Sequence, residues 1–84
     1  MDTQTIHSLI QQGLPDAVID VQGDDGVHFE ARVVSASFAG KSTLARHRMV
    51  NATLGALLGR EIHALALPVT RTPDEQAAAG QGQG

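Results

Sequence analysis

The segment VVSASFAGKSTLARHRMVNATL, residues 33–54, decides the fold, because a strand-like alternation gives way within it to a helix-like pattern. Its centre, Gly40-Lys41-Ser42-Thr43, is similar to the end of a nucleotide-binding P-loop. A P-loop also needs a glycine five residues earlier, because its backbone wraps the phosphates. Ser35 occupies that position and Phe38 lies in mid-loop, so the sequence argues against a nucleotide site.

The same centre is typical of a junction between a loop and a helix. Gly40 permits backbone angles that other residues avoid, and Ser42 or Thr43 can cap a helix that follows directly. Apolar residues continue the helical pattern to a stop at Gly59. Asn51 is a second possible cap, which would divide this stretch into two short helices.

Towards the N-terminus, the sequence predicts a helix and then a β-hairpin. Residues 3–13 carry an apolar stripe at helical spacing, and Pro15 follows as a stop signal. Residues 16–22 and 27–38 alternate apolar and polar side chains, as half-buried strands do. The sequence GDDG between them has the composition of a tight turn.

Towards the C-terminus, residues 61–69 alternate again and predict a third strand. Pro68 indicates that this strand ends there or lies at a sheet edge. Thr72 and Pro73 have the chemistry of a helix start. The chain then becomes rich in Gly and Gln, so we expect residues 77–84 to be a disordered tail after a domain of residues 1–76.

The order of predicted elements is α-β-β-α-α-β-α, which defines the expected fold class. Because a helical crossover precedes the last strand, that strand should pair parallel to a neighbour, whereas the hairpin is antiparallel. The sequence therefore predicts an α+β domain with two layers, in which helices cover one face of a three-stranded mixed sheet.

Composition narrows the classes of function. The chain has 84 residues and no cysteine, which excludes disulfides and a self-contained thiolate metal site. No apolar run is long enough for a membrane span and no secretory signal is evident, so we expect a cytoplasmic protein. No nucleophile–base pair or paired carboxylates stand out, which disfavours an enzyme.

Charge is distributed unevenly, although the net charge is only −3. All six Lys and Arg lie between positions 32 and 71, and the only acid in that span is Glu61. A locally basic face on an acidic protein can meet an anionic partner, although such charges usually serve solubility.

Residues 33–54, together with HALAL at residues 63–67, resemble the two signatures of the BolA-like proteins. The hairpin GDDGVHF looks like that of the short-loop bacterial subgroup, called the IbaG or YrbA type. The resemblance covers about residues 5–74. It implies a fold like the class II KH domain, although the chain lacks the Gly-x-x-Gly loop with which KH domains clamp RNA.

The resemblance implies two activities. One is a partnership with a monothiol glutaredoxin, in which a 2Fe–2S cluster is held jointly with the partner and its glutathione. The other is transcriptional regulation in the stress response, by DNA binding through a segment that looks like a helix-turn-helix. We expect the first, with a heterodimer as the working form and a monomer or weak homodimer when the protein is alone.

Residue roles follow from the resemblance. His63 occupies the position of the family's proposed iron ligand, and imidazole can replace thiolate on iron. His28 matches a second ligand only by its neighbourhood, and a surface strand residue is the alternative. Lys41, Arg46 and Arg48 are expected to supply docking charge, although one of the two arginines can instead pack over the sheet. Phe38, Gly40, His47 and Asn51 fill signature positions, and we expect a structural role for His47 at the helix start.

Overall fold

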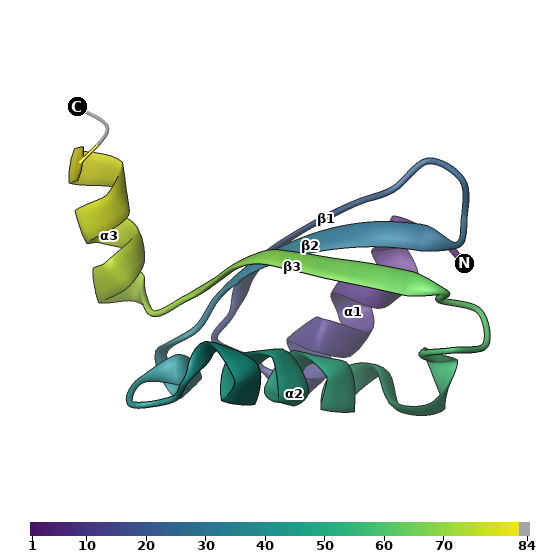
Figure 1. Ribbon diagram of the computed structural model, residues 1–84, viewed down its shortest axis with the longest axis horizontal. Coiled ribbons are helices and arrows are strands. Elements are labelled where there is room, and N and C mark those ends of the chain that lie inside the picture. The colour runs from purple at the N-terminus through teal and green to yellow at the C-terminus, as the bar shows by residue number, and fades with distance from the viewer. Residues whose placement is uncertain (83–84) are drawn as a thin grey trace.

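The structure is a computed structural model that describes residues 1–82. Its helices and strands are α1 (Thr3–Gly13), β1 (Val18–Gln22), β2 (His28–Val34), the short 3₁₀ helix η1 (Ala36–Phe38), α2 (Thr43–Leu54), a second 3₁₀ helix η2 (Gly55–Leu57), β3 (Ala64–Arg71) and α3 (Pro73–Gly82). This order confirms the predicted succession of helices and strands, with η2 as the second helix of the crossover (Figure 1).

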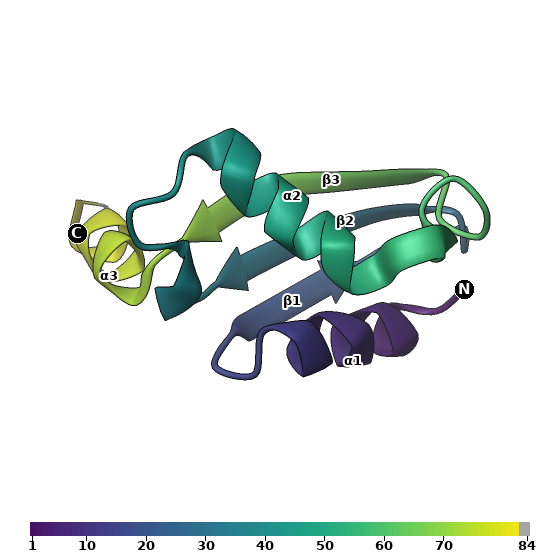
Figure 2. The same ribbon diagram turned by 90° about the horizontal axis from the view of Figure 1, so that it is seen from below.

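The sheet has the order β1-β2-β3, so β2 is central. β1 pairs antiparallel with β2, and β3 pairs parallel with β2, as predicted for a hairpin followed by a helical crossover. α1 and α2 lie side by side against one face of the sheet (Figure 2). α3 leaves the end of β3 and stands apart from this helical layer (Figure 1). The fold is therefore a two-layer α+β domain with a projecting C-terminal helix.

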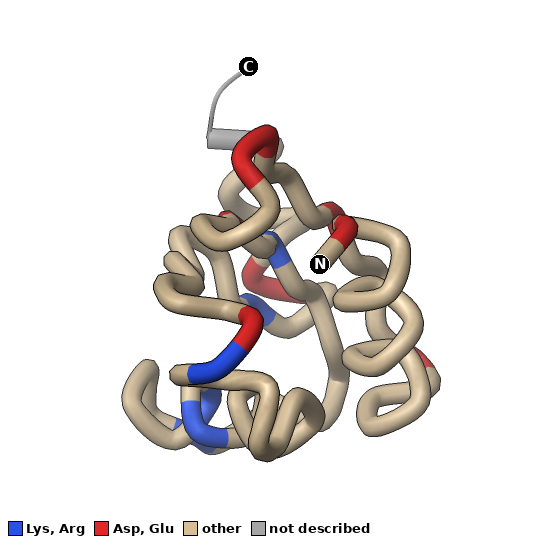
Figure 3. The backbone as a smooth tube through the Cα atoms, turned by 90° about the vertical axis from the view of Figure 1, so that its right-hand side faces the viewer, with Lys and Arg blue, Asp and Glu red and all other residues tan. Residues whose placement is uncertain are grey.

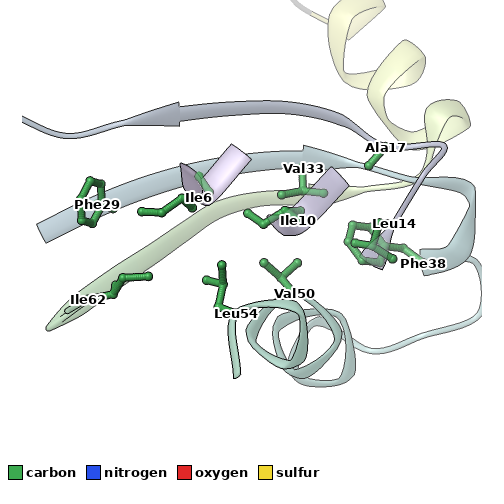
Figure 4. Packing of buried hydrophobic residues seen from close by; sticks show 11 residues of the cluster. Ile6, Ile10, Leu14, Ala17, Phe29, Val33, Phe38, Val50, Leu54 and Ile62 are labelled. Atoms are coloured by element: carbon green, nitrogen blue, oxygen red, sulfur yellow. The ribbon is translucent and has the colours of Figure 1, made fainter. Parts of the chain in front are cut away.

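The core lies between the sheet and the two long helices. α1 contributes Ile6 and Ile10, which are fully buried, and α2 contributes Val50 and Leu54 (Figure 4). From the sheet, the alternating residues of β2 point inward, and the complete set of buried apolar residues is Ile6, Ile10, Leu14, Ala17, Phe29, Ala31, Val33, Phe38, Val50, Leu54 and Ile62. β2 thus buries the face that its alternation predicted, whereas Ile19 and Val21 of β1 and Leu65 and Leu67 of β3 are only partly buried against this core.

β2 is shorter than the sequence predicted, because it ends at Val34 and not at Phe38. The Ser35 hydroxyl donates to the Asp16 carboxylate at 2.9 Å, and the Ala36 N–H donates to the same carboxylate at 2.8 Å. The Ser35 oxygen also accepts from the Ser37 N–H at 3.1 Å and so caps η1. The last bond to β3 is donated by the Ser35 N–H to the Arg71 carbonyl oxygen, at 2.9 Å, and beyond it these side-chain bonds hold the chain as it turns into η1.

α2 is a single helix, so the predicted division at Asn51 is wrong. The Asn51 carbonyl oxygen accepts the N–H of Gly55, which is the C-cap. Gly55 adopts a φ of 57°, a left-handed angle that glycine tolerates. The helix therefore breaks one turn later than the sequence indicated.

Pro68 lies inside β3, which continues to Arg71. β3 is an edge strand, and the register with β2 shifts between Glu30 and Arg32, opposite this stretch. A proline at an edge needs no ladder partner, because it has no N–H to satisfy. Of the two alternatives for Pro68, the edge position is confirmed.

α3 begins with the predicted cap. The Glu75 N–H donates to the Thr72 hydroxyl at 3.1 Å, and the Thr72 N–H donates to the Glu75 carboxylate at 2.9 Å. This reciprocal pair is a capping box. The helix extends to Gly82, past the boundary expected after residue 76, and residues 83–84 of the expected tail lie outside the described residues.

Candidate functional site

His28 and His63 come together at one end of the sheet. His28 opens β2, and its Cα partner in the parallel pairing is Ala64, the first residue of β3. The N–H groups of His63 and Ala64 both donate to the Val27 carbonyl oxygen, at 3.0 and 3.3 Å. Two histidines that are 35 positions apart in the sequence thus lie on neighbouring backbone segments.

Both histidines are exposed, and the His28 ring has a fixed neighbour. Its Nδ1 lies 2.6 Å from an Asp25 carboxylate oxygen. The other oxygen of Asp25 accepts the backbone N–H groups of His28 and Val27, at 2.8 and 3.0 Å. These bonds, with the His28 N–H first, hold the pKa of Asp25 well below its usual range, so the carboxylate is charged.

The two imidazoles fit a shared iron site better than one of the protein's own. In the part of the chain that the structure describes, no group of three or more His, Cys, Asp or Glu side chains is placed to hold a metal ion. A 2Fe–2S cluster takes four protein ligands, and histidine can supply two of them. This end of the sheet therefore has two exposed imidazoles, and a cluster bound there would need its remaining ligands from another molecule.

Arg46, expected as a docking residue, is occupied inside the molecule. Its guanidinium donates to the Thr70 carbonyl oxygen at 2.8 Å and makes two bonds to the Glu75 carboxylate, at 2.6 and 3.0 Å. Its Nε donates to the Lys41 carbonyl oxygen at 3.0 Å, and the group lies 5.8 Å from the centre of the Phe38 ring. The side chain is only 12% exposed, so Arg46 ties α2 to β3 and α3.

The ion pair between Arg46 and Glu75 shifts the pKa of both side chains. The bonds from Arg46, followed by the N–H of Thr72, lower the pKa of Glu75 to about 2. The same carboxylate raises the pKa of Arg46. Both groups are therefore charged throughout the neutral range and already paired with each other.

Lys41 and Arg48 remain as the exposed part of the predicted docking set. Residues 46 and 48 project from α2 in different directions, which leaves Arg48 in solvent while Arg46 faces the sheet. Arg32, on the uncovered face of the sheet, is paired with Glu30 at 3.0 Å. Figure 3 shows the Lys and Arg positions mainly on the α2 side of the molecule and the Asp and Glu positions mainly on the opposite side.

The remaining signature residues serve the fold. Phe38 is fully buried, and Gly40 adopts a φ of 74° in the loop before α2. His47 is half-buried and lines a cleft of about 360 Å³ between α2, β3 and the start of α3. No hydrogen bond to its ring occurs within residues 1–82, and the expected structural role of His47 stays a prediction.

Two acids that matter were not singled out by the sequence analysis. Asp16 organises the end of β2, and Asp25 contacts the His28 ring. The turn composition of GDDG placed Asp25 correctly, and its spacing of three residues before His28 was the available signal. For Asp16, which bonds residues 19 and 20 positions away, no local signal existed.

Comparisons with known proteins agree with this architecture. A family model described as "BolA-like protein" matches residues 7–75. "Protein BOLA2" of Arabidopsis thaliana is 50% identical over 58 residues, which are 69% of this chain and 61% of that protein. The "DNA-binding transcriptional regulator BolA" of Vibrio cholerae is 49% identical over 49 residues, which are 58% of this chain and 46% of that protein. The chain thus spans less than two thirds of either relative.

A solved structure shares the fold over nearly its whole length. The structure of a bolA protein homologue from Coxiella burnetii is 41% identical, with a TM-score of 0.80, and the match covers 92% of this chain and 97% of that one. Within residues 1–82, no helix is long and apolar enough to cross a membrane. The family model, the Arabidopsis thaliana relative and the Coxiella burnetii structure together show that the chain belongs to the BolA-like protein family.

Proposed function

We propose that this protein is a non-enzymatic adaptor that pairs with a monothiol glutaredoxin and shares the ligation of a 2Fe–2S cluster. The cluster is the cargo of the heterodimer, and its thiolate ligands come from the partner and its glutathione. His63 supplies one imidazole ligand and His28 supplies the second. The protein serves the transfer of clusters and has no chemistry of its own.

The observation that carries this proposal is the meeting of His28 and His63 at one end of the sheet. Parallel pairing sets His28 opposite Ala64, directly beside His63, and both rings are exposed. Family membership supports the same reading, because the resemblance of HALAL to the family signature assigns a ligand role to His63.

Docking depends on charged side chains that the fold leaves exposed. Lys41 and Arg48 are exposed on the α2 side, whereas the charge of Arg46 is neutralised by Glu75. We therefore limit the docking residues to Lys41 and Arg48. Exposed charges of this kind speed encounter with an acidic partner and are screened by salt.

The test mixes this protein with a glutaredoxin dimer that holds a 2Fe–2S cluster, and follows visible absorption and circular dichroism. The wild type should change the spectrum, because imidazole replaces thiolate at iron. His63→Ala should lose this change while it still binds the apo partner. His7→Ala, in α1, is the matched control and should behave as wild type. An unchanged spectrum with wild type would refute the adaptor function.

DNA binding is the second candidate, favoured by the exposed Lys41 and Arg48 and by the name of the Vibrio cholerae relative, a DNA-binding transcriptional regulator. The segment around Arg46-His47-Arg48 that looks like a helix-turn-helix is folded as η1, a turn at Gly40 and α2. α2 is followed by η2, which has three residues and is too short to lie in a major groove. Any DNA contact would therefore use α2 itself, with phosphates as its targets.

A further inference from the structure

The hairpin turn before β2 contains a carboxylate that is aimed at the His28 ring. Asp25 Oδ2 lies 2.6 Å from Nδ1 of His28. Within the described residues, this is the one histidine ring that is hydrogen-bonded to another side chain. The His28 side chain is 64% exposed and the Asp25 side chain 46%, so the contact between them adds little to the stability of the fold.

Asp25 is held in place independently of the histidine ring. Its Oδ1 accepts two backbone N–H groups, from Val27 at 3.0 Å and from His28 at 2.8 Å. These two bonds form the turn and fix the plane of the carboxylate. Because the turn already orders the Asp25 side chain, its Oδ2 can bond the His28 ring with little further loss of conformational entropy.

The contact decides which nitrogen of His28 is free. An ionised carboxylate accepts hydrogen bonds and donates none, so Nδ1 must carry the proton in the neutral ring. Nε2 is then left with its lone pair, on the side of the ring away from the turn. Metal-binding histidines commonly have this arrangement, in which a carboxylate holds the other ring nitrogen.

We propose that Asp25 is a positioning residue that fixes the His28 tautomer and makes Nε2 the iron-ligating atom. The inference rests on the proposed function, because it concerns the second of the two histidine ligands. The two histidine rings then differ in when each becomes oriented for ligation. His28 is oriented before the cluster arrives, whereas the His63 ring has no side-chain bond among residues 1–82 and orients on binding.

The test uses Asp25→Asn, which retains the turn and reverses the direction of the hydrogen bond to Nδ1 of His28. The asparagine Oδ1 still accepts both backbone N–H groups, but its NH₂ group donates to Nδ1 where the carboxylate accepted. The ring then prefers a proton on Nε2, which blocks ligation. Asp24→Asn is the matched control, since it removes the same charge from an exposed neighbour in the same turn.

The first measurement is the imidazole tautomer of His28 by nitrogen NMR, in the isolated protein at a pH where the ring is neutral. Wild type and Asp24→Asn should carry the proton on Nδ1, and Asp25→Asn should carry it on Nε2. A wild-type ring protonated on Nε2 would overturn the proposal, and so would a tautomer unchanged by Asp25→Asn. Neither outcome depends on the cluster or the partner.

The second measurement is the affinity for the cluster-loaded glutaredoxin, followed by visible circular dichroism. Asp25→Asn should weaken cluster sharing by about 10–100-fold, the usual effect of losing such a contact, while Asp24→Asn should weaken it far less. Equal affinities of Asp25→Asn and wild type would overturn the ligand-positioning role. If wild type itself shares no cluster, the proposed function fails, and tautomer selection is judged by the NMR result alone.

Discussion

At the scale of single residues, Arg46 shows how a surface-type charge becomes part of the fold. It reaches Glu75, which is 29 positions away in the sequence, and spans α2, β3 and α3. Its neighbour two positions along, Arg48, remains exposed. Two arginines in one short motif therefore have different environments: Arg46 is bonded inside the fold, and Arg48 is exposed and stays a proposed contact for a partner.

The Arg46–Glu75 pair should make stability depend on acid. Glu75 has a pKa of about 2 in the folded protein against 4.5 without its partners, so folding favours its charged form. The contribution is present above about pH 4.5 and is lost as the pH falls towards 2. The melting temperature of wild type should exceed that of Glu75→Gln at neutral pH, and the difference should narrow through this window.

Asp74→Asn is the control for that experiment, because Asp74 is an exposed acid in the same helical turn. The difference in melting temperature between wild type and Asp74→Asn should change little over the same pH window. The effect of Glu75 should be modest, since its side chain is 47% exposed and water screens the pair. A constant difference between wild type and Glu75→Gln across the window would contradict the assigned role of the pair.

The limits of residue-level prediction follow from distance along the chain. The sequence identified His63, Lys41 and Arg48 as candidates, because short motifs and local charge are visible in it. It could not assign Arg46 to Glu75, since nothing local pairs residues that only the completed fold brings together.

At the scale of elements, local chemistry predicted the starts of helices better than their ends. Ser42 and Thr72 cap α2 and α3 as expected, because capping is decided within three residues. The end of β2 was misplaced because it depends on a bond to Asp16, far back in the sequence. The end of α2 was misplaced because the positive-φ cap is Gly55, whereas the sequence offered Asn51 as the cap of a second helix and Gly59 as the stop.

α3 should be the least stable element. It contains two glycines, lacks a strong apolar stripe, and connects to the domain through its first turn, by Thr72 and Glu75. Amide hydrogen exchange should be slow in β2 and fast after Ala77, in keeping with the tail that the sequence predicts. Slow exchange over residues 77–82, comparable to that of β2, would contradict this expectation.

At the scale of the whole molecule, the two proposed contacts occupy different places. The histidine pair lies at the end of the sheet where β2 and β3 begin, and the exposed basic residues lie on and before α2. The fold class was predictable because strand alternation, helix periodicity and turn composition agreed. The convergence of His28 and His63 was not predictable from these patterns, because it depends on the register of a parallel pair.

Binding to duplex DNA tests the second candidate function at this scale. If Lys41 and Arg48 contact phosphates, affinity should fall steeply with salt, and each substitution by Ala should reduce the slope of log K against log salt by about 0.9. Arg46→Ala is a poor substitute, since it also disturbs the fold. An absence of binding at low salt would remove the DNA-binding candidate, and a slope unchanged in Lys41→Ala and Arg48→Ala would exclude these two residues.

The central claim is that an imidazole of this protein ligates a cluster held jointly with glutaredoxin. Its most direct test is pulsed electron paramagnetic resonance of the reduced cluster, with histidine labelled by a heavy nitrogen isotope in this chain only. The account predicts nitrogen hyperfine couplings that change with the isotope, persist in His7→Ala and lose the His63 component in His63→Ala. A heterodimer that holds its cluster but shows no isotope-dependent coupling would contradict the account.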